Sequence, residues 1–302
     1  MTAKGIYVFA PAGGAAATVA QVKAGPFTDV AGFDWLAGWN KLEPSKGVYD
    51  FSVVDDALDA ADAWGKHSQL CLLPGFEEPA WLLTSVPTIQ IQQFNTGKFV
   101  TMCNPVSPAY LTELCSLIAA FGLHNVNDGS IDSVQCSGLG DQGEMVMGKP
   151  VNGEWADYGV TPATLLAAWQ QVINAWYAAF PHTVRSLAIE EPLNRALPML
   201  GELITWIAAT HPMMALQQNG LSDATVAGRN QYWLDLQAWH AAGRPVGWQM
   251  FAGGNDALSL AQAFTTGLAA GGSFFQIYLD DILNPANATV LQTLAVNLAK
   301  RP

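Results

Sequence analysis

The chain has 302 residues, of which 50% are hydrophobic and 13% are charged, and this composition supports a large core and argues against extended disorder. Its formal net charge is −12 and its Lys and Arg residues are scattered singly, so neither a nucleic-acid partner nor an anionic polymer as substrate is expected. No apolar run reaches the roughly 18 to 20 residues that a membrane helix needs, so a membrane partner is not expected either.

Short apolar runs and longer amphipathic segments alternate along the chain. Helical patterns lie near residues 14–24, 52–65, 107–121, 161–179, 196–209, 228–241, 255–269 and 285–299. Ser52 and the pair Thr161-Pro162 are typical helix-start signals. The runs that predict strands are Gly5–Ala10, Phe33–Trp39, Ser68–Leu73, Ile131–Ser137, Val184–Glu190, Met213–Gln218, Val246–Met250 and Phe274–Leu279.

Strands that alternate with helices indicate parallel pairing, and eight such units predict an α/β fold of the (β/α)8 TIM-barrel type. An open, doubly wound sheet is the alternative. We expect one domain over residues 1–302, because no linker or repeat interrupts the pattern. A faint likeness to a signal peptide follows Lys4, but Gly5–Ala10 is needed as the first strand. This favours a cytoplasmic over a secreted protein and leaves both the compartment and the oligomeric state open.

Two strand-to-helix connections, residues 74–106 and 138–160, are unusually long. Long loops in compact domains are usually functional, and both follow the carboxyl end of a strand, where barrel enzymes place their chemistry. Period-two alternation within the strands then predicts which polar side chains point into the barrel near this rim. These are Gln135, Ser137, Glu190, Gln217, Asn219, Gln276, Tyr278 and Asp280.

The remaining reactive residue types exclude several chemistries. All five histidines precede a strand or end a helix, which places them on the lower face, away from the expected site. This argues against histidine-based triads and histidine-bound metals. The four cysteines show no CxxC spacing, so zinc is not expected, and we predict no metal and no cofactor. Carboxylate chemistry is what remains.

The segment Trp39–Phe51 reads WNKLEPSKGVYDF, and Pro79-Ala80-Trp81-Leu82 follows the third strand. Both resemble segments of barrel glycoside hydrolases, namely the family 42 β-galactosidases and their family 5 and family 10 relatives. The resemblance implies a general acid at the end of the fourth strand and a nucleophile at the end of the seventh. It also implies that Glu43 ends a strand and helps to build the loop.

Glu144 is the best match for the acid, although Gly143 replaces the Asn that precedes the acid in the family. The seventh strand offers no carboxylate and carries Gln249 at the expected place. Because glycoside hydrolysis needs a second carboxyl group, Glu190 or Asp280 is expected to serve, and catalysis could also have been lost.

Four of the eleven tryptophans fall at strand ends or in upper loops, where an indole face could stack on a sugar ring. Core packing is the equal alternative for each. The full set of expected substrate-binding residues is Trp39, Glu43, Trp81, Asp141, Trp155, Gln217, Asn219, Trp248, Gln249 and Tyr278.

The sequence thus predicts a glycosidase that cleaves a neutral oligo- or polysaccharide by carboxylate acid/base catalysis. The alternatives are a non-catalytic glycan-binding barrel that lost its nucleophile, and another barrel enzyme, such as a lyase, that uses the same carboxylates.

Overall fold

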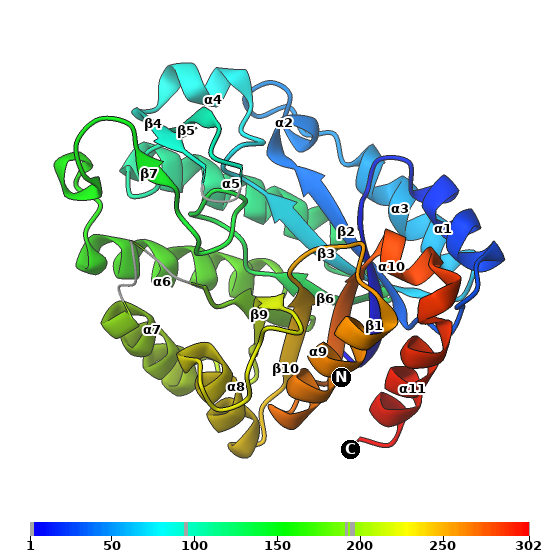
Figure 1. Cartoon of the computed structure of the whole chain (residues 1–302). Helices are drawn as coiled ribbons and strands as arrows, with labels where there is room; N and C mark the ends of the chain where they lie inside the picture. The colour runs from blue at the N-terminus through cyan, green and yellow to red at the C-terminus, as the bar shows by residue number, and fades with distance from the viewer. Residues whose placement is uncertain (1–2, 94–95, 191–192, 194–196, 302) are drawn as a thin grey trace.

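The computed structural model describes residues 3–93, 96–190, 193 and 197–301. Eight parallel strands close into a barrel in the order β1-β11-β10-β9-β8-β6-β3-β2 (Figure 1). The predicted (β/α)8 TIM barrel is confirmed, and the open sheet is excluded because β1 pairs with both β11 and β2. The barrel strands are β1 (Gly5–Pro11), β2 (Gly32–Gly38), β3 (His67–Leu73), β6 (Ile131–Gln135), β8 (Val184–Ala188), β9 (Ala215–Leu221), β10 (Val246–Met250) and β11 (Phe274–Tyr278).

Eight long helices cover the outside of the barrel (Figure 1). They are α1 (Ala15–Ala24), α3 (Ser52–Asp62), α5 (Pro108–Asn125), α6 (Pro162–Ala179), α7 (Leu197–Thr210), α8 (Gln231–Ala241), α9 (Ala257–Ala269) and α11 (Ala288–Ala299). The predicted start of α6 is present as a capping box, in which the Thr161 hydroxyl accepts a hydrogen bond from the backbone N–H of Thr164 at 3.2 Å. Among the described residues, no helix combines the length and apolar character that crossing a bilayer requires.

The two long connections contain regular structure of their own. Residues 74–106 form α4 (Ala80–Ser85), β4 (Thr88–Gln92) and β5 (Phe99–Cys103), and residues 138–160 form β7 (Lys149–Pro150) and the 3₁₀ helix η1 (Trp155–Tyr158). Strand β4 pairs antiparallel with both β5 and β7, so the two connections share a small sheet at the top of the view in Figure 1. Backbone hydrogen bonds across this sheet hold the two connections together at one side of the barrel mouth.

Four predicted strands end one or two residues earlier than expected: β6 ends at Gln135 and β8 at Ala188, and β2 and β11 lead directly into helices. Strand β2 ends at Gly38, and Trp39 begins the short helix α2 (Trp39–Leu42). Strand β11 ends at Tyr278, and the chain turns at once into α10 (Leu279–Leu283), which is followed by the 3₁₀ helix η2 (Pro285–Asn287). Side-chain alternation therefore stops before Trp39 and before Asp280.

The barrel interior changes character along its axis. Its lower end is apolar, with Tyr7, Ala215 and Phe274 fully buried together. Here Gly247 is required, because a Cβ atom at that position would lie 1.9 Å from the Phe274 ring. The upper half is polar, as the alternation predicted, and the amide side chains of four strands meet there. These are Gln69, Gln135, Gln217 and Gln276.

Candidate active site

A cavity of about 320 Å³ opens at the carboxyl ends of the barrel strands. Its walls come from strand ends, including Cys71 of β3, Gln249 of β10 and Tyr278 of β11, and from the two long connections, which supply Glu77 and Glu144. The volume is at the lower end of the range for small-molecule sites. The barrel thus places four predicted residues, Asp141, Glu144, Gln249 and Tyr278, around one cavity.

Glu144 stands at the wall of this cavity and is half-buried. Burial disfavours the charged form and raises the pKa of Glu144 to about 7, while a hydrogen bond from Asn219 acts in the opposite direction. The donor is Asn219 Nδ2, at 2.5 Å from Glu144 Oε1. Near neutral pH the carboxyl group is therefore present in both protonated and ionised forms, as a group that donates and recovers a proton requires.

The orientation of the Asn219 amide is set from below by a line of buried amides. Gln217 Nε2 donates to Asn219 Oδ1 at 2.8 Å and to Gln276 Oε1 at 3.0 Å. Gln276 Nε2 in turn donates to Gln69 Oε1 at 3.0 Å. Because Asn219 Oδ1 is used as an acceptor, its Nδ2 group faces Glu144. The buried amides inside the barrel thus orient Asn219 Nδ2 as a hydrogen-bond donor to the candidate acid, Glu144.

Asp34, which sequence reasoning did not single out, lies on β2 inside the barrel and is 1% exposed. Neither carboxylate oxygen has a hydrogen-bond partner among the described residues. Burial raises the pKa of Asp34 to about 7, and the nearby charge of Glu144 raises it further. The signal was present in the sequence, because a lone aspartate inside an apolar strand is unusual.

Glu77 is the second residue that was missed. It belongs to the connection 74–106, its side chain is exposed, and it lines the same cavity as Glu144. Asn40 Nδ2 donates to Glu77 Oε2 at 2.8 Å, and the backbone N–H of Asn40 donates to the Glu77 carbonyl at 2.7 Å. A Cβ atom at Gly38 would lie 3.0 Å from both Glu77 Cβ and Oε2. Glu77 is therefore fixed over the end of β2, a position that alternation could not reveal because it lies outside a strand.

The other predicted carboxylates have different surroundings. Asp141 lines the cavity, and its Oδ1 accepts the backbone N–H of Gly148 at 2.7 Å, which closes the turn that carries Glu144. Glu190 follows β8, and its Oε1 accepts the backbone N–H of Asn219 at 3.0 Å. The expectation that Asp280 points into the barrel is wrong, because it lies exposed on the first turn of α10.

The expectation of sugar-stacking tryptophans does not hold for Trp39, Trp155 and Trp248, which are almost fully buried. Each donates its indole N–H within the fold, to Glu43 Oε2 at 2.8 Å, to the Gly148 carbonyl at 3.0 Å and to the Gly267 carbonyl at 3.1 Å, respectively. An indole that is sealed in this way has no free face for a sugar.

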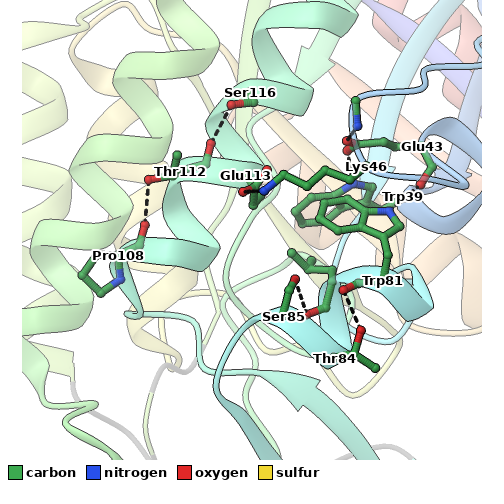
Figure 2. Close-up of polar contacts among 12 residues, drawn as sticks. Trp39, Glu43, Lys46, Trp81, Thr84, Ser85, Pro108, Thr112, Glu113 and Ser116 are labelled. Carbon is green, nitrogen blue, oxygen red and sulfur yellow. Dashed lines mark hydrogen bonds and ion pairs between the residues drawn. The ribbon is translucent and has the colours of Figure 1, made fainter.

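Trp81 is half-buried and packs edge-on against Trp39, and its indole N–H donates to the Glu43 carbonyl at 3.0 Å (Figure 2). The Glu43 carboxylate accepts from Trp39 and also from the backbone N–H of Gly47 at 2.8 Å. Glu43 is 2% exposed, so its hydrogen bonds hold the loop after β2 rather than a ligand.

Two further hollows adjoin the cavity, one at Glu77 and one at Glu144. A hollow of about 490 Å³ shares Glu77 with it and reaches Lys41, Asp50 and Ser52. On the other side, a space of only about 20 Å³ shares Glu144 and ends at Gln93 and Thr96. The groove is therefore wide on the side of α2 and narrow beside the β4–β5 hairpin. Within the described residues, no group of three or more His, Cys, Asp or Glu side chains is placed to hold a metal ion.

Comparisons with known proteins agree with this architecture. Residues 29–120 match the model of glycoside hydrolase family 42, a family that is described as beta-galactosidase. A search of curated protein sequences finds no match. The resemblance to barrel glycoside hydrolases that Trp39–Phe51 indicated is confirmed, because this segment lies within the matched range.

Solved structures share the fold at low identity. The catalytic domain of beta-amylase from Paenibacillus polymyxa aligns over 100% of both chains with a TM-score of 0.70 and 10% identity. The beta-galactosidase of Halorubrum lacusprofundi aligns over 100% of this chain and 58% of its own, with a TM-score of 0.64 and 12% identity. Endo-glycoceramidase II from Rhodococcus sp. aligns over 97% of this chain and 78% of its own, with a TM-score of 0.56 and 13% identity.

Proposed function

We propose that this protein is a glycosidase that cleaves a neutral saccharide and uses Glu144 as its general acid. The observation that carries the proposal is the position of Glu144 in the cavity at the barrel mouth, with a pKa of about 7. A carboxyl group that is partly protonated at neutral pH can protonate the oxygen of a leaving sugar. The fold and the family match of residues 29–120 to beta-galactosidases support the choice of reaction.

Hydrolysis of a glycosidic bond requires a second carboxylate, which acts on the sugar carbon or on the attacking water. We assign this role to Glu77, because it lines the same cavity and is held by Asn40. Glu190 was expected to serve, but it is not among the residues that line this cavity, and its Oε1 accepts the backbone N–H of Asn219. Asp141 is engaged by Gly148. In this scheme the glycosidic C–O bond breaks as Glu144 gives its proton to the leaving oxygen, and Glu77 stabilises the positive charge that develops on the sugar ring. Water then bonds to the sugar carbon and gives a proton to Glu77, and exchange with solvent returns both carboxyl groups to their starting forms.

The other cavity residues bind hydroxyl groups in this scheme. Gln249 and Tyr278 line the same cavity, and burial raises the pKa of Tyr278, so it remains a neutral hydroxyl. Amide and hydroxyl groups of this kind donate to and accept from sugar hydroxyls without adding charge. The hollow of about 490 Å³ beyond Glu77 offers room for the remainder of a saccharide chain.

The test is turnover of a panel of aryl glycosides and oligosaccharides by wild type, Glu144→Gln and Glu77→Gln, with Glu202→Gln as the matched control on an exposed part of α7. We expect the control to keep wild-type turnover. Both site variants should lose at least about 10²-fold in kcat, as expected for removal of an acid or a charge-stabilising group, and should keep measurable saccharide affinity.

Gln249, which stands where the resemblance implies a nucleophile, favours one alternative, a glycan-binding barrel without catalysis. Saccharide binding by wild type without turnover on any substrate would establish that alternative and reject the glycosidase. Turnover that is lost in Glu144→Gln and retained in Glu77→Gln would reject only the role of Glu77.

A further inference from the structure

A second large pocket lies on the opposite face of the barrel. It has a volume of about 570 Å³ and lies at the amino ends of β1, β10 and β11, the face at which Figure 1 marks both ends of the chain. The carboxyl ends of the same three strands supply Phe9, Gln249 and Tyr278 to the candidate active site. The lower pocket is lined by Lys4, His240, Gly243, Arg244, Pro245, Gly271, Ser273, Lys300 and Arg301.

The charge of this pocket is opposite to that of the whole chain. Four of its lining residues are Lys or Arg, out of 13 in a chain whose formal net charge is −12, and its lining contains no Asp or Glu. Within the described part of the chain, none of the four lies within 4.0 Å of a carboxylate. The fold therefore gathers cations from three distant parts of the sequence into one pocket.

Backbone carbonyls hold three of these four cations in place. Arg301 donates to the carbonyls of Leu268 at 2.6 Å and Gly272 at 3.1 Å, and Lys4 donates to the carbonyl of Arg301. Arg244 donates to the carbonyl of Ala208 at 3.2 Å, and its guanidinium lies 4.1 Å from the Trp239 ring centre. These contacts fix the directions of the side chains before any ligand arrives.

Leu268 and Ala208 belong to the last turns of α9 and α7, whose carbonyl ends carry only about half a negative charge each. The partial negative charges at these two helix ends attract Arg301 and Arg244 but are too small to neutralise the four positive charges of the pocket. A guanidinium has five N–H donors, of which Arg301 uses two and Arg244 one in these contacts, so donors remain for a ligand.

We propose that this pocket binds a polyvalent oxyanion, with a phosphate or pyrophosphate group, free or carried on a small molecule, as the ligand class. Guanidinium groups match the geometry of phosphate oxygens, and lysines add point charges around them. His240 adds one more nitrogen to the wall. A volume of about 570 Å³ is larger than a bare phosphate needs and leaves space for an organic group. This site is independent of the proposed glycosidase reaction.

The test is isothermal titration and thermal unfolding with sodium pyrophosphate, inorganic phosphate, glucose 6-phosphate and glucose, all at one ionic strength. The variant is Lys300→Glu, because Lys300 is exposed and its reversal should not disturb the fold. The matched control is Lys23→Glu, which makes the same charge change at the exposed end of α1. Far-ultraviolet circular dichroism verifies that both variants are folded.

We expect saturable binding of pyrophosphate and glucose 6-phosphate to wild type, with no binding of glucose. The dissociation constant should rise about tenfold or more in Lys300→Glu and stay unchanged in Lys23→Glu. Tighter binding of glucose 6-phosphate than of inorganic phosphate would identify an organic ester as the ligand, and the reverse would identify the free anion. Absence of saturable binding to wild type, or equal weakening in both variants, would overturn the proposal.

Discussion

Asn219 Nδ2 donates a hydrogen bond of 2.5 Å to Glu144 Oε1, so a barrel strand directly contacts the carboxyl group of a loop. The turn that carries Glu144 is closed by the contact of Asp141 with Gly148, and the backbone N–H of Phe76 donates to the Asp141 carbonyl at 3.1 Å, but neither contact reaches the Glu144 carboxyl group. The line of buried amides below Asn219 fixes the orientation of the Asn219 side chain, and through it the position of the Glu144 carboxyl group. The chemistry proposed for Glu144 therefore depends on polar residues inside the barrel, where packing alone would favour branched aliphatic side chains.

Activity should decline as the pH rises through about 7. Burial raises the pKa of Glu144 to about 7, so the protonated acid predominates below that value and is lost above it. Measuring kcat/KM from pH 5 to 9 on an activated and a non-activated glycoside checks this. The alkaline decline should be steep for the non-activated substrate, whose leaving group needs the proton. A flat profile between pH 6 and 8 for that substrate would contradict the role of Glu144.

Replacing Asn219 with alanine should move that alkaline limb to higher pH. The Asn219 hydrogen bond lowers the pKa of Glu144, so its loss leaves burial unopposed and favours the protonated form. The control is Asn174→Ala, whose side chain contacts His211 on the lower face. A variant with lower kcat but an unshifted profile would show that Asn219 acts on the ligand rather than through Glu144.

Asp34 should make the protein less stable as the pH rises. Its pKa is raised from 3.8 to about 7, so the folded state binds more protons than the unfolded state between these values. The stability that protonated Asp34 provides is complete below about pH 4 and is lost as the pH rises through about 7, a change on the order of 4 kcal/mol. Urea unfolding of Asp34→Asn at pH 4.5 and pH 7.5 should show a smaller decrease than wild type.

The exposed Asp62→Asn variant is the control for Asp34 and should follow wild type at both pH values. Equal pH dependence in wild type and Asp34→Asn would mean that Asp34 is ionised and solvated in the folded protein.

Sequence periodicity predicted the barrel and its polar interior because both depend on local alternation. Gln217, Asn219 and Gln276 lie inside as expected, since each belongs to a regular strand. Asp280 was misplaced because β11 ends two residues earlier, at Tyr278, and a helix begins at once. Glu77 could not be found, because its position depends on the contact with Asn40 of α2, which is distant in the sequence. Side-chain alternation predicts orientation only within a strand, so it does not apply to residues outside one.

The tryptophan expectation failed for a related reason. A tryptophan at a strand end is equally compatible with a rim and with a core, and the difference is set by what covers it. Trp39 is covered by Trp81 from the connection after β3, while Trp248 faces the helix layer and donates to Gly267 of α9. Both covering contacts are non-local, so no pattern within one segment reports them.

Trp39→Phe should therefore reduce stability and leave saccharide affinity nearly unchanged. Removing the indole N–H leaves the buried Glu43 carboxylate with one donor fewer, a loss of roughly 1 to 3 kcal/mol. Urea unfolding measures the first effect and equilibrium binding of an oligosaccharide measures the second. Trp81→Phe, which removes a hydrogen bond to the Glu43 carbonyl, is the comparison. A large loss of saccharide affinity with an unchanged free energy of unfolding would show that Trp39 contributes to saccharide binding.

Gly38→Ala should reduce turnover through Glu77, because Gly38 lines the adjoining hollow beside Glu77 and not the cavity that contains Glu144. The added Cβ would lie 3.0 Å from both the Cβ and the Oε2 atoms of Glu77, a tight contact that shifts Glu77 by a few tenths of an ångström and disturbs its hydrogen bond with Asn40. Because a misplacement of about 1 Å can reduce kcat by about 10²-fold, we expect this smaller shift to reduce kcat severalfold. The control is Gly129→Ala, where a Cβ meets no atom within 4 Å. If Glu77 is the second carboxylate, Gly38→Ala should lower kcat, as Glu77→Gln does, and should keep the pH dependence that Glu144 imposes. An unchanged kcat in Gly38→Ala would contradict the role of Glu77 in the mechanism.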